Sequence, residues 1–158
     1  MFVYLLWLSL ISFVDLQKNK MYTLCHSPTM DIYYTLCDER RSPTVYLEPC
    51  PISLKDKFNI SLTWIPTMDL HRFSVDFNIW HQSMKVSETT IVFCSGDHDE
   101  YDFCGQLKGE TMYITMEKSL AKFPYIKGTF LANFNFYAGE LLELAACGTA
   151  TLVLKNNI

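Results

Sequence analysis

The chain has 158 residues and a formal net charge of −4, and 49% of its residues are hydrophobic. This length is enough for one domain with a substantial core, and a mildly acidic chain without a cluster of Lys and Arg is a poor candidate for nucleic-acid binding. The six cysteines form no CxxC motif, so the sequence supports neither thioredoxin-type redox chemistry nor a zinc ribbon.

The N-terminal residues 2–14 (FVYLLWLSLISFV) form an apolar run that is too short to span a bilayer comfortably. This pattern predicts a signal peptide over residues 1–18, cleaved between Val14 and Lys20, followed by one domain over residues 19–158. We therefore expect a secreted, extracellular protein without a transmembrane anchor. An even number of cysteines in such a protein predicts three disulfides, but six cysteines allow fifteen pairings, and the residues alone do not choose among them.

Short segments with apolar residues at every second position follow along the chain and predict β-strands. They are residues 32–36, 44–47, 60–64, 73–79, 91–94, 112–116, 130–136 and 148–154. Residues 139–146 (GELLELAA) have a helical composition, but a loop running into the last strand fits them equally well. Eight or nine strands without a convincing helix predict an all-β fold, an immunoglobulin-like antiparallel β-sandwich.

The stretch from Cys94 to Cys104 is short and acidic, and it lies between two of the predicted strands. It predicts a hairpin that a disulfide closes. Its acidic residues Asp97, Asp99, Glu100 and Asp102 lack the spacing of a calcium-binding EF-hand, so a solvated acidic turn is the better interpretation.

No catalytic constellation is evident in the sequence. None of the four histidines has metal-ligand spacing, no serine lies in a GxSxG motif, and no phosphate-binding loop is present. We therefore expect neither an enzyme nor a bound metal or cofactor. One N-glycosylation sequon begins at Asn59.

The aromatic content is high, at 15% with 11 Phe, and it places large side chains on nearly every inward strand position. A sandwich of this size can pack these side chains against each other, or it can hold its sheets apart and line a cavity. Periodicity leaves both alternatives open, although a packed core is the more common outcome.

The segment DHDEYDFCGQLKGET (residues 97–111) closely resembles the signature segment of the ML lipid-recognition family. The segments YTLC (22–25), YYTLCD (33–38), WIPTMDL (64–70) and KGTF (127–130) are also similar to that family at comparable spacing, so the resemblance extends from Tyr22 to the C-terminus. The resemblance implies the disulfides Cys25–Cys50, Cys37–Cys147 and Cys94–Cys104.

The resemblance also implies two sheets splayed around a deep apolar pocket that takes acyl chains. The expected function is then a non-enzymatic co-receptor that presents an amphiphile such as lipopolysaccharide to a Toll-like receptor ectodomain in innate immune signalling. A soluble lipid or sterol carrier of the same fold is the alternative. A disulfide-stapled adhesion or structural domain with a filled core is a third possibility.

Site residues follow from the resemblance, position by position. The expected pocket wall consists of Ile32, Val45, Leu47, Ile60, Leu62, Trp64, Phe73, Val75, Phe77, Ile79, Met112, Ile114, Met116, Leu120, Phe123, Tyr125, Phe130, Ala132, Phe134 and Leu152. The expected basic rim for the lipid head group consists of Lys57, Lys118, Lys122 and Lys127, and the expected receptor patch of Asp97, Asp99, Glu100 and Lys108. Lys118 also continues the alternation of the inward residues before it, which places it at a strand end where its ammonium reaches water.

Two departures from the family pattern bear on the ligand. The last strand carries Ala146, Gly148 and Ala150 where a relative has bulky apolar residues. Thr89, Ala121 and Pro124 stand where that relative has Arg or Lys. We therefore expect lipid binding with weak discrimination for the phosphates of lipopolysaccharide.

Overall fold

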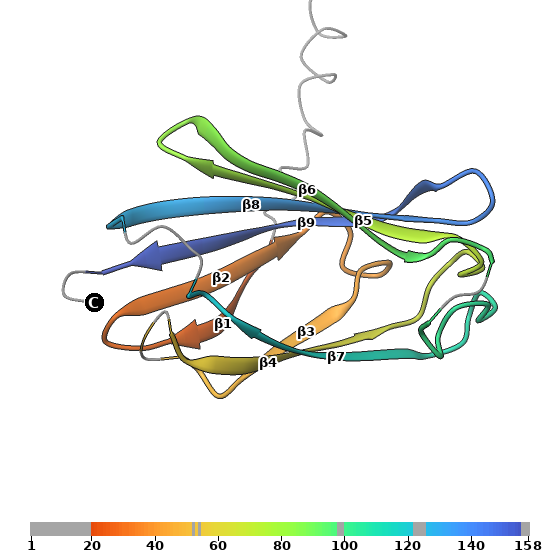
Figure 1. Cartoon of the computed structure of the whole chain (residues 1–158), viewed down its shortest axis with the longest axis horizontal. Helices are drawn as coiled ribbons and strands as arrows, with labels where there is room; N and C mark the ends of the chain where they lie inside the picture. The colour runs from red at the N-terminus through yellow and green to blue at the C-terminus, as the bar shows by residue number, and fades with distance from the viewer. Residues whose placement is uncertain (1–19, 52, 54, 98–99, 122–125, 156–158) are drawn as a thin grey trace, which may run out of the picture.

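The computed structural model describes residues 20–51, 53, 55–97, 100–121 and 126–155. Within these residues the secondary-structure elements are nine β-strands, without a helix (Figure 1). The strands are β1 (Met21–His26), β2 (Met30–Leu36), β3 (Thr44–Glu48), β4 (Lys57–Trp64), β5 (Phe73–His81), β6 (Met84–Cys94), β7 (Met112–Ser119), β8 (Gly128–Ala138) and β9 (Glu143–Leu154). The predicted all-β sandwich is confirmed.

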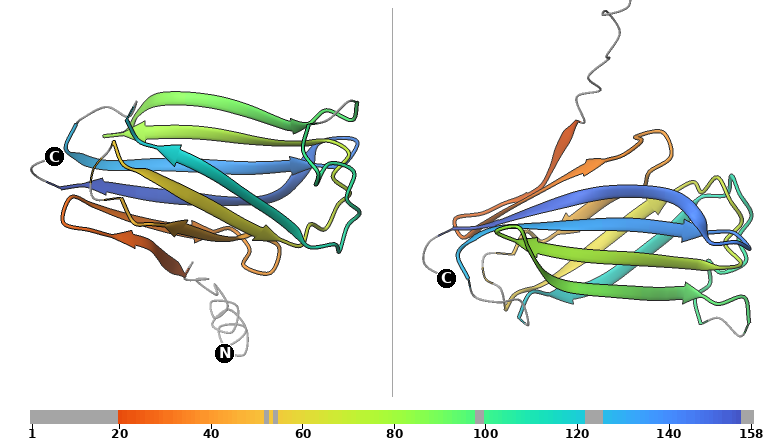
Figure 2. Two further views of the ribbon diagram at one scale, coloured as in Figure 1. Left: turned by 60° about the horizontal axis from the view of Figure 1, so that its bottom comes forward. Right: turned by 90° about the horizontal axis from the view of Figure 1, so that it is seen from above.

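The nine strands form two antiparallel sheets that face each other. The larger sheet has the order β1-β2-β9-β8-β5-β6 and the smaller sheet the order β3-β4-β7, and the strands of the two sheets cross at an angle (Figure 2). Among the described strands, β1 and β3 are the only pair from different sheets whose backbones approach one another. The sheets are thus joined along one edge and splayed towards the edge formed by β6 and β7.

The prediction of a hairpin across Cys94–Cys104 is wrong. The strand that ends at Cys94 is β6, which pairs with β5, whereas β7 pairs with β4 in the other sheet. The segment between them is therefore a crossover from one sheet to the other. The disulfide closes a loop within this crossover, because the sequence separation of 10 ends before β7 begins. Alternation marks a strand but does not indicate which sheet it joins.

Two further segments refine the predicted elements. Strand β1 escaped prediction because a bulge between Thr23 and Cys25 breaks its two-residue period. Residues 139–142 form the turn between β8 and β9, so the loop alternative for residues 139–146 holds and β9 begins earlier than predicted. Leu142 in this turn has a φ of 50°, a conformation that bulky residues rarely adopt.

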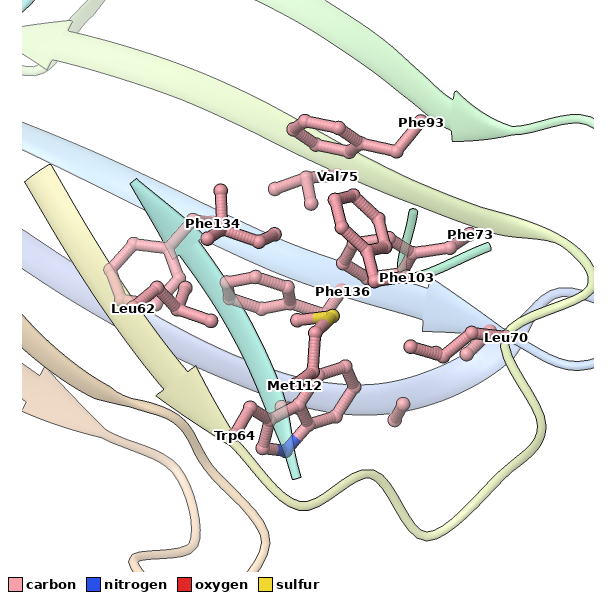
Figure 3. Packing of buried hydrophobic residues seen from close by; sticks show 14 of the residues in the cluster. Leu62, Trp64, Leu70, Phe73, Val75, Phe93, Phe103, Met112, Phe134 and Phe136 are labelled. Carbon is pink, nitrogen blue, oxygen red and sulfur yellow. The ribbon is translucent and has the colours of Figure 1, made fainter. Parts of the chain in front are cut away.

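An aromatic cluster closes one end of the sandwich (Figure 3). Phe73 stacks on Phe93 with ring centroids 5.4 Å apart and on Phe136 at 6.1 Å, and Trp64 lies 5.7 Å from Phe136. All four side chains are buried. The crossover loop is bonded to the β4–β5 connection at this end, where the Leu70 N–H donates to the Gln106 carbonyl at 2.8 Å. We call this the closed end.

The three disulfides are Cys25–Cys50, Cys37–Cys147 and Cys94–Cys104, the pairs that the family resemblance implies. Cys25 lies in β1 and Cys50 follows β3, so their bond joins the sheets at the edge where these strands meet. Cys37 follows β2, and Cys147 lies within the neighbouring strand β9.

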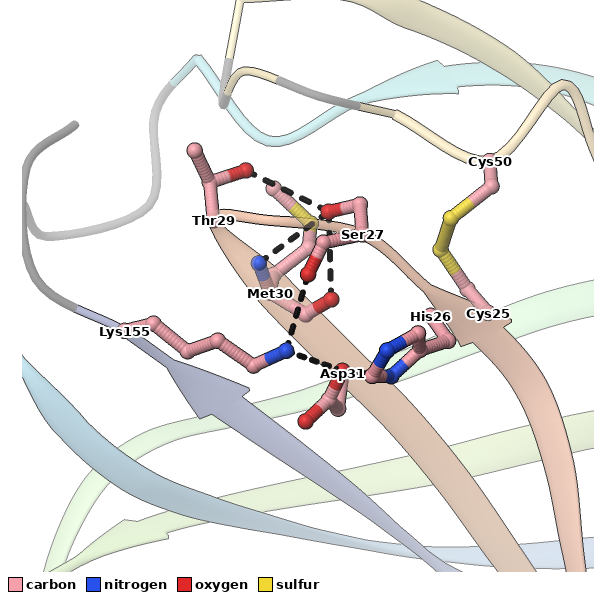
Figure 4. A network of polar contacts seen from close by, with 8 residues as sticks. All are labelled: Cys25, His26, Ser27, Thr29, Met30, Asp31, Cys50 and Lys155. Carbon is pink, nitrogen blue, oxygen red and sulfur yellow. Dashed lines mark hydrogen bonds and ion pairs between the residues drawn. A yellow bond between two sulfur atoms is a disulfide. The ribbon is translucent and has the colours of Figure 1, made fainter.

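A polar network fixes the C-terminal end of β9 to the β1–β2 turn at the opposite end (Figure 4). The Lys155 Nζ lies 2.6 Å from the Asp31 carboxylate and donates to the Ser27 carbonyl at 2.8 Å, and His26 Nδ1 is 2.6 Å from the same carboxylate. The hydrogen bond from Lys155 outweighs burial and holds the pKa of Asp31 below its usual value. The network is therefore intact above the ordinary carboxyl pKa and weakens as the pH falls through the lowered value.

Candidate functional site

A cavity of about 500 Å³ lies between the two sheets. This volume is in the range of known ligand pockets. Of the two alternatives that periodicity left open, the structure shows sheets held apart rather than a core filled throughout. The lining consists of Leu24, Ile32, Tyr34, Val45, Leu47, Phe58, Ile60, Leu62, Phe73, Val75, Phe77, Ile79, Ile91, Phe93, Ile114, Met116, Lys118, Ser119, Leu120, Phe130, Ala132, Phe134, Phe136, Ala150 and Leu152.

The two-residue period of the strands positions this lining. On β8 the inward residues are every second residue from Phe130 to Phe136, and the last three of them pair across the sheet with Ile79, Phe77 and Val75 of β5, which also line the cavity. Phe77, Ile79 and Met116 are only partly buried: each packs against the core on one side and faces the cavity on the other. The wall is therefore continuous, apolar and built from both sheets.

The cavity opens at the end opposite the aromatic cluster. Lys118 and Ser119, near the end of β7, line the cavity and are exposed, which places them at the mouth. Lys118 pairs with Phe58 across β4 and β7, so both side chains lie on the inner face. As expected from the alternation, the ammonium of Lys118 lies at a strand end that reaches water.

Tyr34 contributes the other polar group of the described wall. Burial raises the pKa of its phenol above the usual value, although a hydrogen bond with the backbone of Val45 opposes this rise. The phenol is therefore neutral at pH 7. The cavity wall carries no catalytic constellation in the residues that the structure describes, and none of those residues form a group of three or more His, Cys, Asp or Glu that could hold a metal ion.

Most of the expected wall residues in the described part of the chain line the cavity. Trp64 and Met112 are the exceptions: both are fully buried in the packed cluster at the closed end, one step beyond the deepest lining residues. Phe123 and Tyr125 lie outside the described residues.

Several lining residues were not expected from the sequence. Tyr34 and Phe136 lie on the inward faces that the alternation of residues 32–36 and 130–136 indicates, so this signal was available. Leu24 and Phe58 lie in β1 and β4 but outside the predicted strand segments. Ala150 was noted in the sequence only as a small residue where a relative has a bulky one, and it was not expected in the cavity wall.

The expected basic rim is only partly found at the mouth. Lys57 lies at the mouth end of β4 but on the outer face, where its Nζ donates to the Glu117 carboxylate at 2.7 Å. This hydrogen bond raises the pKa of Lys57. Its side chain lies on the outer face because the neighbouring Phe58 is the inward residue, and a role for Lys57 in head-group binding stays a prediction. Lys127 is exposed before β8, and Lys122 lies outside the described residues.

The expected receptor residues lie far from the mouth, in the crossover loop at the closed end. Asp97, Glu100 and Lys108 are exposed, and the Lys108 N–H donates to Asp69 Oδ1 at 2.8 Å, which ties the loop to the β4–β5 connection. Asp99 lies outside the described residues. Asn59 is exposed on β4, on the face of the smaller sheet that points away from the cavity.

Within the described residues, no helix has the length and apolar character needed to cross a membrane.

The sequence is similar along nearly its whole length to curated proteins named lymphocyte antigen 96. It is 28% identical to the human protein over 148 residues, covering 93% of this chain and 92% of the relative. It is 26% identical to the Bos taurus protein over 154 residues, covering 97% and 96%. No family model matches the sequence.

Two solved structures have a similar fold. Chicken MD-1, solved in complex with lipid IVa, has a TM-score of 0.73 at 18% identity and covers 87% of this chain and 99% of its own. A Niemann-Pick type C2 protein from the Japanese carpenter ant has a TM-score of 0.50 at 17% identity, covering 80% and 93%. Together with the curated relatives, they confirm the resemblance to the ML lipid-recognition family that the signature segment indicates.

Proposed function

We propose that this chain, which resembles the ML lipid-recognition family along nearly its whole length, is a secreted, non-enzymatic lipid-binding co-receptor. It holds the acyl chains of an amphiphile such as lipopolysaccharide in the cavity and presents the amphiphile to a Toll-like receptor ectodomain. The observation that carries this proposal is the cavity itself, which is apolar from the aromatic cluster to a mouth where Lys118 and Ser119 are exposed. Chicken MD-1, which has a similar fold, was solved with lipid IVa, and this supports the lipid-binding part of the proposal.

The energetics of such a cavity favour acyl chains. Each methylene that leaves water for an apolar wall contributes about 0.8 kcal/mol, so a chain of ten methylenes gains about 8 kcal/mol before the loss of its own freedom. No directional contact is needed for this gain. A charged or strongly polar ligand has no such advantage, because the wall offers few groups to pair with it.

The mouth decides how much the head group contributes. Lys118 is the one cationic side chain among the described residues that line the cavity, and Lys57 is paired with Glu117 on the outer face. An exposed charge contact to a phosphate contributes about 1 kcal/mol, far less than the acyl chains. This observation favours a second candidate function, a soluble carrier of lipids or sterols, in which no receptor takes part.

Receptor binding distinguishes the two candidates, and the crossover loop is the proposed contact. Its disulfide and its hydrogen bonds to the β4–β5 connection hold the loop against the closed end, so its exposed charges are presented on a fixed surface. Such a surface contributes to partner choice and association rate and is screened by salt.

We expect the double substitution Asp97→Lys and Glu100→Lys to weaken capture by a Toll-like receptor ectodomain by about tenfold or more at physiological salt, because two attractions become repulsions of roughly 1 kcal/mol each. Lipid content should not change, since the mouth lies at the other end. The matched control is Glu48→Lys with Glu88→Lys, which makes the same charge change at exposed positions on β3 and β6. Surface plasmon resonance with lipid-loaded protein measures the effect. If the Asp97 and Glu100 variant binds the receptor as tightly as its control, the patch is misplaced; if the wild-type protein holds lipid but binds no receptor, the carrier function replaces the co-receptor function.

A further inference from the structure

The inward face of β9 carries a row of small residues, and most of their neighbours on β8 and β2 are large. Ala146, Gly148 and Ala150 occupy three successive inward positions of this strand. Their partners on β8 are Phe136, Phe134 and Ala132, and the β2 partners of Gly148 and Ala150 are Leu36 and Tyr34. On the side that faces the cavity, the surface of the larger sheet is therefore recessed along β9.

Because Gly148 has no side chain, the ring of Phe134 can pack directly over the backbone of β9. A Cβ added to Gly148 would lie 2.4 Å from Phe134 Cζ and 2.6 Å from the Thr35 carbonyl oxygen, so any side chain here would collide with both the ring and the β2 backbone. The Phe134 ring thus covers Gly148 directly. The ring occupies the space of the missing side chain, which lets the cavity continue past it.

Ala150 and Ala132 form the next row towards the mouth. They pair directly across β9 and β8, both line the cavity, and both are only half-buried. The row on the mouth side is Phe130 with Leu152, and both of these large residues also line the cavity. The alanine pair therefore forms a depression in the cavity floor, between the mouth and the deep wall at Phe73 and Phe93.

We propose that Ala150, together with Ala132, sets the length of the acyl chain that the cavity accepts, by leaving the passage open from the mouth to the aromatic wall. This inference rests on the proposed lipid binding and names its ligand as a long, unbranched acyl chain. From Phe130 to Phe136 the cavity follows six residue steps of β8, or about 20 Å at roughly 3.4 Å per residue. An extended hydrocarbon advances about 1.25 Å per carbon, so this path takes a chain of about 16 carbons.

The substitution Ala150→Leu tests the proposal, because a leucine here fills the depression without touching the mouth. The Phe130 row and the Ala132 row lie two residue steps apart, or about 7 Å, which leaves room for roughly six carbons below the mouth row. Thr151→Leu is the matched control: it places the same side chain one residue further along β9, on the outer face of the sheet.

The measurement is a series of binding titrations with saturated fatty acids of 6, 8, 10, 12, 14 and 16 carbons. The affinity of the wild-type protein and of T151L should rise through the whole series. A150L should follow them for the 6-carbon acid and level off from about 8 carbons, so that it binds the 16-carbon acid at least tenfold more weakly than T151L does. A parallel series of lysophosphatidylcholines with the same acyl chains tests whether the length limit depends on the acyl chain or on the carboxylate head group. If it depends on the acyl chain, the affinity of A150L should level off at the same chain length in both series.

A folded A150L protein that binds every acid as T151L does would overturn the proposal. Folding is checked by the melting temperature, which should not fall because the added methyl groups fill empty apolar space. If A150L does not fold, Ala132→Leu fills the same depression from β8 and should give the same profile. A wild-type protein that binds none of the acids or lysolipids would instead contradict the proposed function. This result can be told apart from failure of the length proposal, in which the wild-type protein binds the acids and A150L shows the same dependence on chain length.

Discussion

Replacing Phe134 by Glu is expected to abolish lipid capture while leaving a folded protein. The Phe134 ring lies at the floor of the cavity, covering Gly148 and packed edge-on against Phe136 with centroids 5.7 Å apart. A carboxylate at this position would face an apolar wall and a bound acyl chain without a partner. Burying such a group costs several kcal/mol, so the affinity for an acyl ligand should fall by a hundredfold or more.

The control for this substitution is Tyr113→Glu, which puts the same carboxylate on β7 but on the outer face, where Tyr113 is 73% exposed. Titration of both purified variants with a fluorescent fatty acid gives the comparison. Ala132→Glu is a second test at a position that is already half-exposed to the cavity, and it guards against misfolding of the Phe134 variant. Folded protein with Glu at position 134 and undiminished lipid binding would show that the ligand lies elsewhere.

Loss of the Cys37–Cys147 disulfide is expected to have the largest effect on folding. This bond closes a loop with a sequence separation of 110, whereas Cys94–Cys104 spans 10. The chain-entropy model gives about 5 kcal/mol for the long loop and about 3 kcal/mol for the short one. A typical domain has only about 5–15 kcal/mol of stability, so the longer loop carries a large share.

The double variants Cys37→Ser with Cys147→Ser and Cys94→Ser with Cys104→Ser avoid unpaired thiols and allow a direct comparison. Secreted yield and the denaturant midpoint should fall much further for the first pair than for the second. The opposite order would mean that the crossover loop, rather than the join between β2 and β9, limits the stability of the fold.

The alternation of residues was enough to predict eight of the nine strands, at least in part, and their inward faces, because a strand that buries one face must place apolar residues at every second position. Phe73, Val75, Phe77 and Ile79 are the clearest case, and all four line the cavity. Alternation also placed Lys118 at the mouth. The family resemblance, rather than the pattern, supplied the disulfide pairs.

The pattern could not indicate how the strands assemble into sheets. Cys94 and Met112 begin and end a crossover rather than a hairpin, because strand pairing depends on contacts between distant residues. The resemblance places Lys57 among the rim residues, but only the structure shows that its side chain lies on the outer face beside Glu117, while its neighbour Phe58 faces the cavity.

The shape of the floor was equally hidden from the sequence. The sequence shows Ala150 as small where a relative has a bulky residue, but only the register shows that it lies beside Ala132. A glycine at position 148 reads as a weak point in a strand, but the structure shows that only glycine fits between Phe134 and the Thr35 carbonyl. The role of a small residue depends on its neighbours in space, and these are known only from the packed structure.

The most direct test of lipid binding is native mass spectrometry of the purified wild-type protein, followed by mass spectrometry of lipid extracted from the same sample. We predict protein that carries close to one equivalent of acyl lipid, with a predominance of chains of about 16 carbons, the length that the cavity takes. Protein that carries no lipid, and that takes up none when it is incubated with lipid A or with 16-carbon lysophosphatidylcholine, would contradict lipid binding in this cavity.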